Sequence, residues 1–497
     1  MDHYATGTKA GVCSTSIEAS EAALWALDQD GNAADAYLTA ALAQTVCEPG
    51  LTSVGGAFGI QYFEAAKAQT TYVVGLLGPA AAEPYDFDRH SPVTQTGRAM
   101  PVPGYLAGVY EAHRRYGKLD WAKLFQPAIR HAKEGFLVNP EIIAAAERKA
   151  LKDPGSKELW LRNGRLLKSD EPLVQTQLGR LLAAVAKDGP VALYESDFAQ
   201  HYVKRAQADG GKITLDDLKN WQARVKNSKL ELRGNYRGYQ VVSAPLLVYA
   251  LHLNEALDLR SSGAASPESV NKQLRIMEEV FLSVKKLSKE NEATFIDLAH
   301  ARKRADFVMN SPRRKFTLDA IFNTCFLVVR DRHGNCAWGT HSINSPSAFG
   351  AGIMVDGVYA SYVINRDHVR GDGATAPGIS TSYALFKDGT PHHIVGSPGY
   401  GFVHGPYQYG TAVVEWKLSP PKAMNLPRFS LPNADGEIVV ENHYDPKVQA
   451  MLTEEKIAHR LVKPSSATGI VGALQVDDGA KLHFAQDGRR SGFARAR

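Results

Sequence analysis

Thr324 is a hydroxyl residue in a stretch where it could act as a nucleophile. The residues around it are mostly β-branched or aromatic, so we expect a strand over residues 321–331. A lone threonine in a strand is usually structural, because a hydroxyl is a weak nucleophile unless a base lies within hydrogen-bond reach. Strand alternation places Thr324, Phe326 and Val328 on one face, and Cys325, Leu327 and Val329 on the other.

The segment that follows adds polar groups at one end of the same hairpin. Gly334-Asn335 predicts a turn, and a second strand expected over residues 336–343 returns antiparallel to the first. Its far end carries Thr340, Ser342 and Asn344, where a plain buried strand would be apolar. This polarity makes a purely structural role for the hairpin less expected than the lone threonine alone would suggest.

Two patterns in this hairpin carry a family resemblance. They are T-x-x-x-x-V-x-D-x-x-G-N from Thr324 to Asn335, and T-x-S/T-x-N from Thr340 to Asn344. With the glycine-rich turn at residues 396–401, they resemble the γ-glutamyltranspeptidase family of N-terminal-nucleophile hydrolases. The resemblance extends over the whole chain. The chain is similar to a divergent member of this family.

The resemblance implies both a fold and a maturation step. The fold would be α+β, with the four-layer αββα arrangement of N-terminal-nucleophile hydrolases. The precursor would cut itself between Asn323 and Thr324, giving a large segment, 1–323, and a small segment, 324–497, that together form one structural unit. Thr324 would then supply both the nucleophile and, through its freed α-amine, the base. Such an amine has a reference pKa of roughly 7.7–8.0, which suits proton transfer near neutral pH.

The family's site residues map onto four further positions. Ser342 matches the hydroxyl that orients the nucleophile, and Asn344 matches a residue that contacts the polar end of the substrate. Gly399 and Tyr400 match the pair whose backbone N–H groups form the oxyanion hole, where two donors face the developing charge. Tyr400 replaces the usual glycine, which keeps the N–H group but should reshape the pocket.

The family's grip on a γ-glutamyl carboxylate is missing from the expected positions. An arginine normally precedes an A-P step, but here Gly75 lies before Gly78-Pro79. Two carboxylate-binding serines are replaced by Gly378 and Ile379. A carboxylate prefers a bidentate guanidinium, so ordinary γ-glutamyl compounds are not the expected substrate.

A looser match supplies two more substrate-binding candidates. The family's N-N-x-x-x-D run aligns with residues 362–367, and places Arg366 and Asp367 there. Arg366 could provide a cation from another side, although an exposed arginine is the simpler interpretation.

We therefore expect a self-processing hydrolase or acyltransferase acting on a small amide. One alternative is a C–C bond hydrolase of a biosynthetic or catabolic pathway on the same scaffold. Another is an inactive relative that serves as a binding protein, against which the intact Thr324, Ser342, Asn344 and Gly399 argue.

Composition and charge limit the kinds of partner that we expect for this protein. The chain has 497 residues, a net charge of +5 and no concentrated basic face, so we expect no nucleic-acid partner. It has no apolar run of about 18 residues and no apolar segment near Met1, and its four cysteines form no disulfide pattern, so we expect no membrane span and a cytoplasmic location. The expected partners are a small-molecule substrate and the two fragments of the chain itself, and a homodimer of the processed heterodimer is an option.

Neither a metal nor a cofactor is expected. The histidines that suggest a metal, His341, His392, His393 and His404, follow no ligand spacing. The glycine-rich residues 54–59 lack the Lys-Ser/Thr of a phosphate loop, and close backbone packing explains them better.

Three segments should position or flank the hairpin. A capping box over residues 15–18, with Thr15 as the cap, begins a helix, and Asn32 caps a second, buried helix through Val46. Residues 286–315 are basic and polar, and we expect a solvated loop there, just before the proposed cleavage bond.

Overall fold

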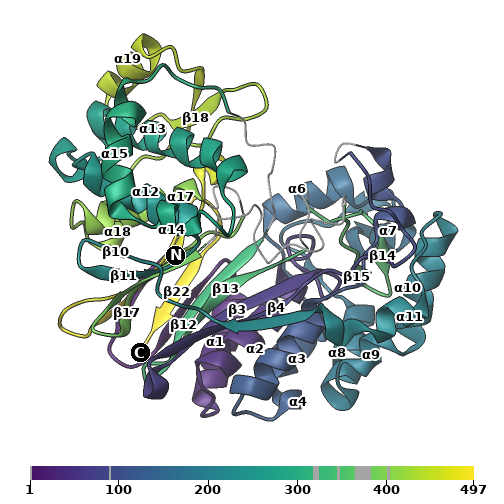
Figure 1. Cartoon of the computed structure of the whole chain (residues 1–497). Helices are drawn as coiled ribbons and strands as arrows, with labels where there is room; N and C mark the ends of the chain where they lie inside the picture. The colour runs from purple at the N-terminus through teal and green to yellow at the C-terminus, as the bar shows by residue number, and fades with distance from the viewer. Residues whose placement is uncertain (1–2, 89–90, 317–323, 344–347, 364–381, 400–402) are drawn as a thin grey trace. The chain divides into compact units, whose positions relative to one another are not determined.

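The structure is a computed structural model that describes residues 3–88, 91–316, 324–343, 348–363, 382–399 and 403–497 (Figure 1). The chain forms two compact units. Unit 1 comprises residues 1–8, 230–321 and 374–497, and unit 2 comprises residues 9–229 and 322–373. The predicted division at Asn323–Thr324 concerns a cleavage and stays a prediction.

Unit 2 is built on an antiparallel sheet with the strand order β2-β12-β13-β3-β4-β9. These strands are β2 (Gly11–Ser14), β3 (Ala57–Glu64), β4 (Gln69–Gly75), β9 (Val225–Lys229), β12 (Cys325–Arg330) and β13 (Cys336–Ser342). Short pairs add β5 (Phe136–Leu137) with β8 (Pro172–Leu173), β6 (Leu161–Arg162) with β7 (Arg165–Leu166), and β14 (Met354–Val355) with β15 (Val358–Tyr359).

Helices α1, α2 and α3 pack on one face of this sheet (Figure 1). The helices of unit 2 are α1 (Ile17–Asp28), α2 (Ala33–Cys47), α3 (Tyr105–Tyr116), α4 (Trp121–Leu124), α5 (Gln126–Glu134), α6 (Pro140–Lys149), α7 (Pro154–Trp160), α8 (Thr176–Asp188), α9 (Val191–Tyr194), α10 (Asp197–Ala208) and α11 (Leu215–Lys219). Every residue of α2 is buried, as its apolar sequence predicts.

The two predicted helix caps have different outcomes. Asn32 does cap α2, and with Asp35 it forms a full capping box. The prediction that Thr15 caps α1 is wrong. Ser16 is the cap and accepts from Ala19 N at 3.1 Å. Thr15 is not available, because its hydroxyl donates to the buried carboxylate of Glu48 at 2.6 Å.

The glycine-rich stretch before β3 packs against backbone, as predicted. A Cβ on Gly56 would lie 2.1 Å from the carbonyl oxygen of Ser342, and one on Gly55 would lie 2.4 Å from that of Tyr359. Larger residues would therefore push β13 away from the start of β3.

Unit 1 has its own antiparallel sheet, with the order β1-β21-β20-β17-β16-β11-β10. Its strands are β1 (Tyr4–Gly7), β10 (Gly234–Tyr236), β11 (Tyr239–Val242), β16 (Ser382–Lys387), β17 (Thr390–Gly396), β20 (Gly472–Val476) and β21 (Leu482–Gln486). Unit 1 also holds β22 (Phe493–Ala496) and the parallel pair β18 (Ile438–Glu441) and β19 (His459–Val462). Its helices are α12 (Pro245–Ala256), α13 (Pro267–Ser283), α14 (Glu292–Phe295), α15 (Leu298–Asn310), α17 (His404–Val414), α18 (Pro420–Asn425) and α19 (Pro446–Glu454).

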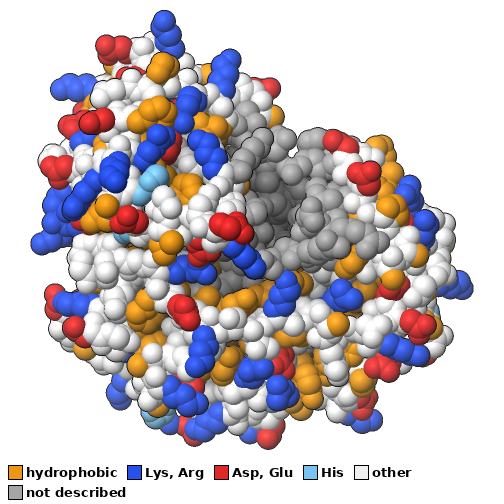
Figure 2. Space-filling view, viewed as in Figure 1, with side chains coloured by type: hydrophobic (Ala, Val, Ile, Leu, Met, Phe, Trp, Pro, Cys, Tyr) orange, Lys and Arg blue, Asp and Glu red, His pale blue; other side chains and the backbone are white. Residues whose placement is uncertain are grey.

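The predicted solvated loop at residues 286–315 is wrong for most of its length. Asp297 caps α15, whose buried residues Ala301, Ala305 and Val308 recur at helical spacing, and α15 packs against α12 and α13. The basic residues at the end of the segment are paired as well. Arg314 bonds to Glu278 and Glu279 of α13. Figure 2 shows basic, acidic and hydrophobic side chains mixed at the surface of this helical region.

Candidate active site

The β12–β13 hairpin places Thr324 opposite Ser342. Cys325 pairs with His341 in the strand register, so the next position outward is Thr324 against Ser342. The Thr324 Oγ1 hydroxyl donates to Ser342 Oγ at 3.1 Å. Both residues are only 7% exposed. The predicted nucleophile and its predicted orienting hydroxyl are therefore in direct contact and largely buried from solvent.

Alternation along β12 separates this pair from the core. Cys325, Leu327 and Val329 belong to the apolar cluster formed with α1, α2 and α3. The Thr324 side chain projects to the other face, as predicted. The reactive hydroxyl thus lies on the sheet face opposite the helices that hold the strand.

The D-x-x-G-N part of the motif locks the turn. Asp331 Oδ1 accepts from the backbone N–H groups of His333 at 2.8 Å and Asn335 at 3.0 Å, and Asp331 Oδ2 accepts from Ala33 N, at the start of α2, at 3.0 Å. Asn335 Oδ1 in turn accepts from Ala65 N. A carboxylate at a helix N-terminus is electrostatically favourable. These residues fix the hairpin on the start of α2.

His341 is adjacent in sequence to Ser342 but is not a base for Thr324. Its ring lies among the aromatic rings of Tyr37, Phe58 and Tyr105, with centroids 5.9–6.4 Å away. Neither ring nitrogen has a hydrogen-bond partner among the described residues. Burial lowers the pKa of His341 to about 3, so the ring is neutral at ordinary pH.

A buried carboxylate that we did not predict from the sequence contacts Cys325, the residue after Thr324. Glu48 is 3% exposed, and its Oε2 accepts from Thr15 Oγ1 at 2.6 Å, from the Gln44 side chain, and from Cys325 Sγ at 3.4 Å. Its partners come from separate segments of the chain, so no local sequence pattern predicts the cluster. The signal available was Glu48-Pro49 directly after a helix that is otherwise buried and apolar.

Of the remaining predicted site residues, the structure describes Gly399. Gly399 is in unit 1, is buried, and has φ +101°, a conformation that favours glycine. The other predicted positions, Asn323, Asn344, Arg366, Asp367 and Tyr400, lie outside the described residues.

Among the residues described, no three or more His, Cys, Asp or Glu side chains gather as a metal ion would require. No helix in the described ranges is long and apolar enough to cross a membrane.

Comparison with known proteins agrees with this geometry. The family described as Gamma-glutamyltranspeptidase matches residues 19–360, which include both strands of the hairpin. The chain belongs to the γ-glutamyltranspeptidase family.

Relatives within and around this family differ in how much they share. Acylase ACY 1 proenzyme of Pseudomonas sp. (strain SE83) is 28% identical over 73% of this chain and 70% of its own length. Glutathione hydrolase 3 of Arabidopsis thaliana is 32% identical, but over 47% of this chain and 37% of its own length. The chain thus spans less than half the length of that plant relative.

A solved structure shows the fold. Cephalosporin acylase from Bacillus halodurans superposes with a TM-score of 0.77 over 99% of this chain and 97% of its own, at 21% identity. The predicted α+β N-terminal-nucleophile hydrolase fold is confirmed.

The family's carboxylate-binding arginine has no room at Gly75. A Cβ there would lie 2.0 Å from the carbonyl oxygen of Gly104 and 2.7 Å from Gly108 N, because β4 ends against α3. Arg224 supplies a different cation at this loop, which we did not predict from the sequence. A Cβ on Gly78 would lie 2.7 Å from Arg224 Cδ and Nε, and that Nε is buried without a partner among the described residues.

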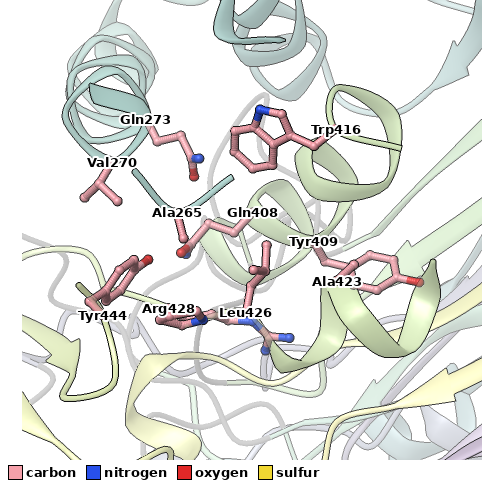
Figure 3. Close-up of a pocket in the computed structure, with 11 residues that line it drawn as sticks. Ala265, Val270, Gln273, Gln408, Tyr409, Trp416, Ala423, Leu426, Arg428 and Tyr444 are labelled. Carbon is pink, nitrogen blue, oxygen red and sulfur yellow. The ribbon is translucent and has the colours of Figure 1, made fainter. Parts of the chain in front are cut away.

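The family-like end of the chain, residues 487–492, forms part of a buried ionic cluster in unit 1. Arg428, 1% exposed, pairs with Asp487, and Arg489 bonds to Glu441 at 2.5 and 2.6 Å and to Asp487 at 3.1 Å. A cavity of about 20 Å³ beside Arg428 is lined by Gln273, Gln408 and Tyr444 among others (Figure 3). It has room for about one water molecule and for no substrate.

Proposed function

We propose that this protein is a self-processing enzyme that uses Thr324 to hydrolyse or transfer the acyl group of a small amide. The observation that carries the proposal is the 3.1 Å hydrogen bond from Thr324 to Ser342 at the start of β12. Family membership supports it, because the matched region contains this hairpin. Acylase and glutathione hydrolase relatives support amide substrates.

Each half of the reaction needs two proton transfers and no cofactor. After cleavage of the Asn323–Thr324 bond, the α-amine of Thr324 takes the proton from Oγ1 as that oxygen attacks the substrate carbonyl. The C–N bond then breaks, the leaving amine takes the proton, and an ester to Oγ1 remains. Water, or an acceptor amine, then attacks the ester carbonyl and gives a proton to the α-amine. The bond between the acyl carbon and Oγ1 breaks, Oγ1 takes that proton back, and the acid or the new amide leaves. Ser342 holds Oγ1 in place, and the oxyanion role of Gly399 that the family pattern implies stays a prediction.

The two fragments should remain together after the cut. In unit 2, β12 and β13 from the small segment pair with β2 and β3 from the large segment. In unit 1, β16 of the small segment pairs with β11 of the large one. Cleavage removes one peptide bond and leaves these ladders intact, so the fragments should copurify under native conditions.

The test is a denaturing gel of purified protein. Wild type should give pieces of about 35 and about 19 kDa, from the share of the 54.1 kDa chain on each side of the bond. Thr324→Ala should remain one piece, and Thr324→Ser should still cleave. Wild-type protein that stays whole while it turns over an amide would contradict the proposal.

Ordinary γ-glutamyl compounds should be poor substrates. The arginine site is closed at Gly75, and each lost charge-assisted contact is worth about 1.5–3 kcal/mol, so two losses lower kcat/KM by about 10²–10⁴-fold. A γ-glutamyl anilide, compared with the same anilide of an uncharged acyl group, measures this directly. Equal turnover of both would support the expectation. Strong preference for the γ-glutamyl compound would contradict it, and Arg224→Met would then show whether Arg224 binds its carboxylate.

A further inference from the structure

Glu48 occupies an unfavourable place. It directly follows Cys47, the last residue of α2, where a carboxylate opposes the helix dipole at a cost of about 0.3–1 kcal/mol. A second acid, Glu18 of α1, is close. Its pKa is raised, first by burial and also by the charge of Glu48. A well-packed apolar side chain at position 48 would avoid both costs.

Glu48 is linked to the start of β12 by its hydrogen bond with Cys325, and we call this contact the tether. Its Oε2 is held by Thr15 and Gln44, and it accepts from Cys325 Sγ at 3.4 Å. Because a hydroxyl, an amide and a thiol all donate to one oxygen, the arrangement suits an ionised carboxylate, which only accepts. Cys325 is fully buried and is the first residue of the strand.

The cut makes this tether important. Before cleavage, the chain on both sides restrains Thr324. After cleavage, Thr324 is a terminus, and chain termini fray unless they are tied down. Its position then depends on Cys325, the first residue of the ladder, and on the contact with Ser342. Cys325 is the neighbouring residue whose side chain reaches a fixed charged group.

We propose that Glu48 is a positioning residue for the nucleophile, acting through the thiol of Cys325. It holds the start of β12 so that Thr324 Oγ1 stays against Ser342, and its negative charge stabilises the ammonium form of the new N-terminus. The inference rests on the proposed function, since it needs Thr324 as a free terminus.

Other titratable groups that face this cluster are Glu18 on α1, Tyr37 and Cys47 on α2, Tyr105 on α3, and His341 on β13. Burial is the main cause of each pKa shift: the pKa of Tyr37 and of Cys47 is raised, that of Glu18 is raised, and that of His341 is lowered to about 3. Tyr37, Cys47 and His341 are therefore neutral near pH 7. Glu18 can share the electrostatic effect, so Glu18→Gln accompanies Glu48→Gln as a comparison.

The experiment follows acylation of the cleaved enzyme by p-nitrophenyl acetate, read as nitrophenolate release, with Thr324→Ala as the blank. Cys325→Ala should lower the acylation rate by about 10-fold with KM little changed, and Cys325→Ser should restore most of it. Leu327→Ala is the matched control. It truncates a buried side chain on the same face of the same strand, two residues further from the nucleophile. It should lower the Tm at least as much and leave the acylation rate within about 2-fold.

The charge is tested by the pH profile. Glu48→Gln should move the rising limb of the acylation rate to lower pH, because an amine without a nearby anion loses its proton more easily. Glu18→Gln should move it less. Equal rate losses in Cys325→Ala and Leu327→Ala, or a rising limb that Glu48→Gln leaves in place, would overturn the inference. Failure of wild type to cleave, or no nitrophenolate release above the blank, would instead overturn the proposed function.

Discussion

Two polar clusters, one in each unit, lie on family-like parts of the sequence and differ in the charge of their groups. In unit 1, Arg428, Asp487, Arg489 and Glu441 form a closed network in which every charge has an opposite partner. In unit 2, Thr324 and Ser342 share one hydrogen bond between two neutral hydroxyls. Both clusters are buried.

The difference separates structure from chemistry. A buried ion pair whose partners satisfy each other has no capacity left for a substrate, and its loss leaves an unpaired charge in a dry interior. A hydroxyl carries no charge, can both donate and accept a hydrogen bond, and can give its proton to a base when it attacks a substrate. The ionic cluster should therefore govern stability, and the hydroxyl pair should govern rate.

The largest expected effect is on stability in unit 1. Arg489→Met leaves Glu441 without its arginine partner and takes one of two arginines from Asp487, and it should lower the free energy of unfolding by about 3–5 kcal/mol, measured by urea unfolding. Arg489→Lys keeps the charge but not the two-pronged contact with Glu441 and should lose less. At temperatures where Arg489→Met is folded, self-cleavage should proceed normally. A folded variant that does not cleave would show that the comparison is wrong.

The same contrast explains what the sequence could reveal. The hairpin, its faces and the cap of α2 follow from local periodicity and turn chemistry, and Thr324, Ser342 and the turn motif lie within 19 consecutive residues. The cluster at Glu48 and the ionic cluster join segments that are distant in the chain, so no local pattern contains them. The loop predicted at residues 286–315 failed for a related reason. Its basic side chains look solvated in sequence, but Arg314 finds acids on α13.

Buried histidines provide the next largest effect, because burial keeps their rings neutral, unlike the charged side chain of Arg428. Burial lowers the pKa of His341, His393 and His404 to about 3 each. In the unfolded chain these rings take up protons below about pH 6.5, while the folded rings do not, so the unfolded state binds more protons. Stability should therefore fall as pH drops from about 6.5 toward 3, by up to about 1.4 kcal/mol per pH unit for each ring.

Urea unfolding at pH 7.0 and 5.5 measures this loss. His341→Leu removes one of the three groups and should make the pH dependence shallower by roughly a third, whatever its effect at pH 7. An equal pH dependence in wild type and His341→Leu would mean that His341 is not held neutral.

Ser342→Ala tests the hydroxyl pair itself. Removing the acceptor of Thr324 Oγ1 should slow self-cleavage and acylation by about 10–100-fold, which corresponds to about 1.4–2.7 kcal/mol of activation free energy. The free energy of unfolding should change by no more than about 1.5 kcal/mol, the net value of one hydrogen bond. Ser342→Thr retains the hydroxyl and is the matched control. A large loss of stability without a loss of rate would place Ser342 with the structural cluster.

The smallest expected effect concerns His341 and the rate. In a mechanism with a histidine base, removing that base costs about 10³-fold or more. His341 projects toward Tyr37, Phe58 and Tyr105, on the sheet face opposite Thr324, and with a pKa near 3 it is a poor proton acceptor at neutral pH. His341→Leu, assayed below its melting temperature, should therefore keep the acylation rate within a few-fold and the rising limb of the pH profile in place. That limb should instead follow the α-amine of Thr324. A collapse of the rate in His341→Leu, with folding and self-cleavage intact, would assign the base to this histidine.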